Sequence, residues 1–159
     1  MKKKFLSLFV LAVSLFCCQN SFALDVSGAK VSADTLKQYK DVTDNENVIQ
    51  AVELLKGTTG KYSRDAILGQ NLSKKPMKIE FTNLGAINPL YTNFDALGWK
   101  KKKNLCIYIN EKHKDAPIEA LSAILAHEAI HQDEFNSLNE ETYAWTLEAA
   151  VWTQLTEDN

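Results

Sequence analysis

One short stretch near the C-terminal end carries the residues best suited to chemistry. His127 and His131 are four residues apart, and Glu128 directly follows the first of them. In an α-helix, residues at this spacing lie one turn apart on the same face, so both imidazoles could bind one zinc ion. A glutamate at this position would lie beside the open coordination position, where it could act as a general base. The pattern therefore predicts a zinc-binding catalytic helix.

The helix expected to carry this motif spans residues 117–135 and is apolar on nearly all sides. No charged residue lies between Glu119 and His127. Such a helix is typical of a protein core, where imidazoles and carboxylates are costly unless they are paired or bind a metal. The alternative is that the two histidines are ordinary core or surface residues. The chain contains three histidines in total, and two of them have the spacing of metal ligands.

A zinc ion requires a third protein ligand if one position is to remain open for water. The candidates are the carboxylates that follow the second histidine: Asp133, Glu134, Glu140, Glu141 and Glu148. On a helical wheel, Asp133 and Glu134 point away from the histidines. Ser137 and Glu140 match a capping box at the start of the last helix, which gives Glu140 a competing role.

Glu141 is the best placed of these carboxylates. If the chain turns near Asn136, Glu141 lies as far after the turn as His131 lies before it. In a helix hairpin these two positions face one another. Glu148 lies past the histidines on the same face of the last helix, where it could hold a histidine N–H group or simply be solvated. The alternative role of Glu141 is a favourable interaction with the helix dipole.

The histidine motif, followed by Glu141-Thr142-Tyr143-Ala144, resembles the zincin metallopeptidases of the gluzincin type, in which a glutamate on the next helix is the third ligand. The resemblance implies a small α+β domain with a short sheet, a backing helix, the HExxH helix and a C-terminal helix that carries the third ligand. It also implies cleavage of a peptide or protein substrate by a metal-activated water, with Glu128 as the general base.

Such a reaction also requires a group that stabilises the oxyanion. The candidates are His113, Tyr108 and Tyr143, and the alternative for each is an ordinary core or surface role. In enzymes of this type, the strand before the motif helix often pairs with an extended substrate. Residues 104–110 are therefore a candidate edge strand.

Two helices are expected to flank the motif helix. Apolar residues recur at helical spacing over residues 48–55, and Asn45 or Asn47 could cap this helix at its N-terminus. It could serve as the backing helix. The last helix is expected to run to about Leu155. Its two tryptophans, Trp145 and Trp152, are expected in the core.

Two strands are expected between these helices. Residues 77–84 alternate between apolar and polar side chains, and residues 104–110 are rich in β-branched and aromatic residues. Residues 85–98 are expected to form a loop with aromatic anchors. The lysines at 100–103 favour a solvated turn or a charged strand edge, and the alternative is a patch that attracts substrate.

The N-terminal residues have the pattern of a secretory signal peptide. Lysines 2–4 precede an apolar stretch over residues 5–18, and Ser21-Phe22-Ala23 offers a cleavage site. An uncleaved anchor is the alternative. Residues 24–159 would then form a single domain with no stable membrane anchor, in the periplasm or outside the cell.

Removal of residues 1–23 takes away three lysines and no acidic residue, so the formal charge changes from −2 to −5. This charge argues against nucleic acid or an acidic membrane surface as a partner. Cys106 would be the remaining cysteine, so no intramolecular disulfide could form. An exported domain without disulfides must depend on its core or on a bound metal.

Three hypotheses follow from the sequence. The first is an exported zinc-dependent hydrolase, a small metallopeptidase. The second is a non-catalytic module of the same fold that binds a metal or a partner, and the third is an exported helical domain without metal. Glu128 favours the first over the second, because a structural zinc site needs no general base.

Overall fold

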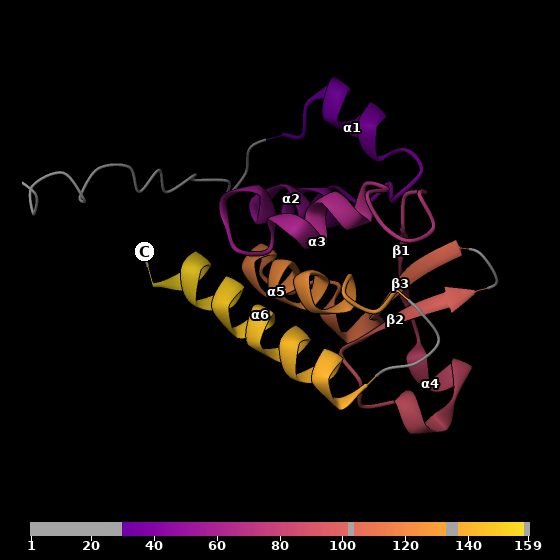
Figure 1. Cartoon of the computed structure of the whole chain (residues 1–159). Helices are drawn as coiled ribbons and strands as arrows, with labels where there is room; N and C mark the ends of the chain where they lie inside the picture. Colours follow the sequence, from indigo (N-terminus) through magenta and orange to yellow (C-terminus); the bar gives the residue numbers. More distant parts are fainter. Residues whose placement is uncertain (1–29, 102–103, 133–136, 158–159) are drawn as a thin grey trace, which may run out of the picture.

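The computed structural model describes residues 30–101, 104–132 and 137–157 of the 159-residue chain, so the predicted signal peptide lies outside the described residues. The elements form a mixed α+β fold, as the sequence predicts (Figure 1). Their bounds are α1 (Ala33–Tyr39), α2 (Glu46–Leu54), α3 (Lys61–Ile67), β1 (Lys78–Thr82), α4 (Leu84–Ile87), β2 (Ala96–Lys101), β3 (Asn104–Asn110), α5 (Ile118–Glu128) and α6 (Leu138–Thr156). None of the helices in the described ranges has the length and apolar character that a membrane span requires.

The sheet has the strand order β1-β3-β2, with β1 parallel and β2 antiparallel to β3. The prediction of a strand over residues 104–110 is confirmed, because this is the range of β3. The prediction that this strand is an edge is wrong. Strand β3 pairs on both sides, so its backbone groups are already used, and the two edge strands of the sheet are β1 and β2.

Helix α5 lies between α2 and α6, and β2 approaches its C-terminal end (Figure 1). One buried cluster joins the inner face of the sheet to α2 and α5 through residues such as Ile107, Val52 and Leu125. A second cluster joins α5 to α6 through residues such as Ala126 and Val151. Because α5 packs against neighbours on both sides, it requires apolar residues on nearly all of its faces.

Side-chain caps fix where the flanking helices begin. The Asn45 side chain accepts a hydrogen bond from the Val48 N–H group at 3.1 Å, so Asn45 is the cap of α2. Helix α6 begins after Ser137, whose hydroxyl accepts a hydrogen bond from the Glu140 N–H group at 3.1 Å. The backbone half of the predicted capping box is therefore present.

The tryptophans of α6 are not in the core, contrary to the prediction. Trp145 is 60% exposed and Trp152 is 45% exposed. The buried face of α6 instead consists of Ala144, Leu147 and Val151. These residues repeat at helical spacing one position away from the tryptophans, which rotates the two rings out of the core by about 100°.

Two further boundaries differ from the predictions. Residues 85–98 are not a simple loop, because they include most of α4, a 3₁₀ turn at Pro89–Tyr91 and the start of β2. Helix α5 ends at Glu128 rather than at residue 135. Beyond it, the N–H groups of Ile130 and His131 donate to carbonyls three residues earlier, which tightens the chain into a turn.

Candidate metal centre

The two histidines of the motif lie at the C-terminal end of α5. His127 is in the last turn of the helix, and His131 follows in the tightened turn. Both side chains are buried. Their ring centroids are 5.2 Å apart, so the four-residue spacing brings the rings together even though the helix has already ended.

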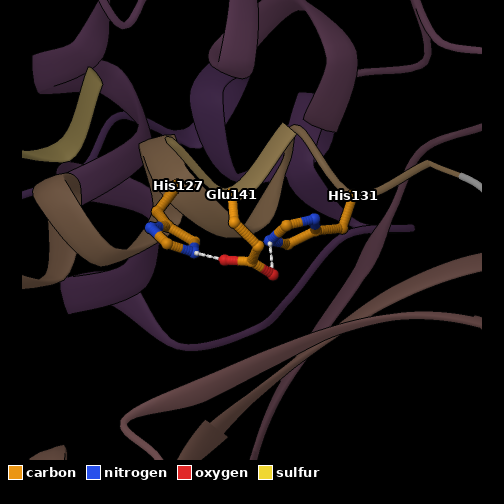
Figure 2. A group of neighbouring side chains, drawn as sticks. All are labelled: His127, His131 and Glu141. Carbon is orange, nitrogen blue, oxygen red and sulfur yellow. Dashed lines mark ion pairs between the residues drawn. The ribbon is translucent and has the colours of Figure 1, made fainter. Parts of the chain in front are cut away.

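Glu141, in the first turn of α6, places its carboxylate between the two rings (Figure 2). Its Oε2 atom lies 3.6 Å from Nε2 of His127, and its Oε1 atom lies 3.6 Å from Nε2 of His131. These distances are too long for good hydrogen bonds. Two ligand atoms each about 2.1 Å from a tetrahedral zinc ion are about 3.4 Å apart, so the three side chains have the spacing of a metal site. This His-His-Glu group could hold a metal ion.

The Nδ1 atoms of both rings face other carboxylates. Nδ1 of His131 is hydrogen-bonded to Oε1 of Glu140 at 2.8 Å. Nδ1 of His127 lies 2.9 Å from Oε2 of Glu148, but off the direction of the ring N–H bond, so this contact is an ion pair rather than a well-aligned hydrogen bond. Since a carboxylate accepts hydrogen bonds, this arrangement favours a proton on Nδ1 and leaves the lone pair of Nε2 for a metal.

The two flanking carboxylates, Glu148 and Glu140, each contact one histidine ring. Glu148 lies beside a histidine, as one of its two sequence hypotheses expected. Glu140 does not use its side chain to complete the capping box. Its carboxylate instead contacts His131, while its backbone N–H group donates a hydrogen bond to the Ser137 hydroxyl. Asp133 and Glu134 lie outside the described residues.

Glu128 lies against β2, one of the two edge strands of the sheet. Its Oε2 atom accepts a hydrogen bond from the backbone N–H group of Gly98 in β2. Burial raises the pKa of the Glu128 carboxyl, and the nearby His127, His131 and Gly98 N–H group only partly oppose this. The carboxylate is thus held beside the two histidines, at the side of α5 that faces β2.

Gly98 is a site residue that the sequence analysis missed. A Cβ atom at this position would lie 2.5 Å from the carbonyl oxygen of Glu128 and 3.0 Å from Cβ of His131. The close approach of β2 to α5 therefore requires glycine here. A glycine inside a strand can signal such a close approach. This signal could not be used here, because the sequence analysis did not predict strand β2.

The cluster contains more acidic than basic groups. Burial has the largest effect on the pKa of His127 and would lower it, but the contact with Glu148 and the charges of Glu128 and Glu141 outweigh burial and raise the pKa. Four carboxylates surround two imidazoles in this small volume, when Glu140 is included. A bound cation would compensate their charge by replacing the protons of the histidines.

Within the described residues, no hydrogen bond or ion pair joins the three oxyanion candidates to these ligands. His113 is hydrogen-bonded through Nε2 to Asp95 at 2.7 Å and lines a pocket that also contains Glu148. Tyr143 is 56% exposed and makes no hydrogen bond within the described part of the chain. Tyr108 packs against Trp99, on the opposite face of the sheet from the buried Ile107 and Ile109.

Comparisons with protein-family models, with curated proteins and with solved structures find no match to this chain. The case for a metal centre therefore depends on the geometry of His127, His131 and Glu141. That geometry combines two buried imidazoles, a carboxylate from the neighbouring helix and a supporting carboxylate on each ring.

Proposed function

We propose that the protein is an exported zinc-dependent hydrolase that cleaves peptide bonds. The observation that carries this proposal is the pair of 3.6 Å separations between Glu141 and the Nε2 atoms of His127 and His131. In a cluster held by hydrogen bonds alone, these atoms would be expected to approach to about 2.7–2.9 Å. They are instead separated by nearly the distance expected between two ligands of one ion.

The donor set favours zinc in a catalytic arrangement. Two imidazole nitrogens and one carboxylate oxygen suit this ion, and three protein ligands leave one position open. A zinc ion held there would supply Lewis acidity and lower the pKa of a water to about 7. Glu128 would take the proton of the attacking water, and Glu140 and Glu148 would orient the two ligand rings.

The second candidate is a non-catalytic module that holds a metal on the same fold. One observation favours it: the Glu128 carboxylate joins α5 to β2 through the Gly98 N–H group. A glutamate with this structural contact need not act as a base. The two candidates therefore differ in what a substitution of Glu128 would change.

A Glu128→Gln variant separates them. The purified parent and variant are analysed for zinc by mass spectrometry and for cleavage of fluorescently labelled casein. We expect both to contain one zinc ion, and we expect the variant to lose about 10²–10⁴-fold in rate. Glu119→Gln, on the same helix one residue after its start, is the matched control and should retain activity.

Each alternative has its own outcome. Zinc in both proteins with equal cleavage would refute the hydrolase and leave the metal-binding module. Absence of any bound metal from the parent, even after incubation with zinc, would refute both candidates.

A further inference from the structure

A pocket of about 370 Å³ continues from the metal centre along α5 and α6. On α5 its wall includes Ala120 and Ile124, which share a helix face with His127 at spacings of three and four. On α6 it includes Trp145 and Glu148, which share a face with Glu141 at the same spacings. The pocket therefore begins about one helical turn, roughly 5.4 Å, from the proposed metal ligands.

Two tryptophans form the walls of this pocket. The Trp145 ring also packs edge-on against the His127 ring, with centroids 4.9 Å apart, and so joins the pocket to the metal centre. Trp152 lies two turns further along α6. Small side chains such as Ala120 and Ala123 leave the space between the helices open. Tryptophan faces attract cations and also pack well against methylene groups.

Two acidic side chains, Glu148 and Asp95, line the pocket. Glu148 uses Oε2 to contact His127, while its Oε1 atom makes no hydrogen bond to the part of the chain that the structure describes. At another side of the pocket, Asp95 is already bound by Lys112 at 2.8 Å and His113 at 2.7 Å. Glu148 is thus the acidic group with an oxygen available to a ligand.

We infer that this pocket selects the substrate and takes a long side chain with a cationic end, arginine or lysine, from a peptide. The methylene stem would lie over the alanines between the two tryptophans, and the charged end would reach Oε1 of Glu148. The inference rests on the proposed function for its place in catalysis. The binding preference itself can be measured without catalysis.

Binding is measured by tryptophan fluorescence in a Trp99→Phe variant, in which Trp145 and Trp152 are the remaining tryptophans. The probes are the Nα-acetyl amides of arginine, norleucine and glutamate. We expect the arginine probe to bind at least fivefold more tightly than the norleucine probe, and the glutamate probe to bind weakest. Removal of one wall by Trp152→Ala should weaken arginine binding by about five- to tenfold.

A pair of opposite charges tests the role of electrostatics. Ala149 is exposed on α6 and lines the pocket, so Ala149→Glu and Ala149→Lys should both fold. We expect the glutamate variant to bind the arginine probe about two- to fivefold more tightly and the lysine variant to bind it less tightly by a similar factor. Equal losses in both variants, or norleucine binding as tight as arginine binding, would show a neutral apolar pocket and overturn the inference.

Measurements of peptide cleavage test the pocket and the hydrolase separately. We expect peptides with arginine or lysine to be cleaved with a lower KM than matched norleucine peptides, and Trp152→Ala to raise that KM with little change in kcat. Casein cleavage without any preference for basic side chains would overturn the pocket assignment and leave the hydrolase intact. Selective arginine binding by a protein that holds no zinc would refute the hydrolase alone.

Discussion

The contact between Gly98 and the end of α5 yields the most direct test of the architecture. Substitution of Gly98 by alanine places a Cβ atom 2.5 Å from the carbonyl oxygen of Glu128, whereas ordinary contacts begin at 3.4 Å. Strand β2 must therefore withdraw from α5 by about 0.9 Å. The nearest atom is a backbone carbonyl oxygen and the next is Cβ of His131 at 3.0 Å, so neither of the two closest contacts can be relieved by the movement of a flexible side-chain end.

Two costs follow from this withdrawal. Overpacking at a tight contact costs about 1–3 kcal/mol. The shift also lengthens the hydrogen bond from the Gly98 N–H group to the Glu128 carboxylate, and a bond to a charged group contributes about 1.5–3 kcal/mol when fully lost. Because the shift weakens this bond rather than removing it, we expect Gly98→Ala to lower the free energy of unfolding by about 2–4 kcal/mol.

Urea unfolding followed by circular dichroism measures this difference. Gly57→Ala is the matched control, since a Cβ atom there meets nothing within 4 Å, and its free energy of unfolding should change by no more than about 0.5 kcal/mol. If Gly98→Ala were as stable as the parent, β2 could not lie as close to α5 as described. The proposed placement of Glu128 against β2 would then be wrong.

Three further predictions concern the metal centre and the core. Zinc at about 100 times its dissociation constant should raise the free energy of unfolding by about 2.7 kcal/mol, and a chelator should abolish the accompanying rise in Tm. Glu148→Gln should weaken zinc binding by about 10–100-fold in competition with a chromophoric chelator, whereas Glu119→Gln should not. Burial and then Glu53 hold the pKa of Tyr39 well above its usual range. The contribution of the neutral Tyr39 hydroxyl to the free energy of unfolding should therefore be fully present below about pH 10 and should be lost as the pH rises further. Tyr39→Phe should lose about 1 kcal/mol at neutral pH through loss of the 2.6 Å bond to Glu53, and it should remove that part of the alkaline decline in urea-unfolding measurements.

The proximity of His127, His131 and Glu141 could be predicted because it depends on short-range rules. Two histidines four residues apart lie on one side of a helix, and the tightened turn after Glu128 keeps the same winding and so keeps His131 beside His127. A helix hairpin then brings positions on opposite sides of the turn together. Strand β3 could be predicted for a similar reason, because its β-branched and aromatic residues favour an extended chain on their own.

Strand β2 and its glycine could not be predicted in this way. The sequence of Ala96–Lys101 contains a glycine and ends in lysines, which weakens any intrinsic preference for a strand. Its extended conformation is fixed by pairing with β3, where Gly98 lies opposite Ile107. Strand propensity depends strongly on such partners, and they become visible only in the folded chain.

The early end of α5 also arises from tertiary contacts. Nothing in Ala129–Gln132 breaks a helix locally, since these residues include neither glycine nor proline. The Gln132 side chain instead donates to the carbonyl of Ala129 at 3.2 Å and accepts from the N–H group of Leu72 at 3.1 Å. The Gln132 amide thus gives the Ala129 carbonyl a hydrogen bond that a backbone N–H group would have supplied if the helix had continued.

This termination explains how Glu141 can follow His131 so closely and still face both histidines. A helix that continued to residue 135 would leave a single residue before the Ser137 cap, too few for α6 to turn back along α5. Because α5 ends at Glu128 and α6 begins at Leu138, nine residues separate the two helices. Within that stretch, the tightened turn keeps His131 beside His127, and Glu140 then binds Nδ1 of His131 from the first turn of α6. The short spacing and the shortened helix are therefore two consequences of one arrangement, in which the turn itself carries a ligand.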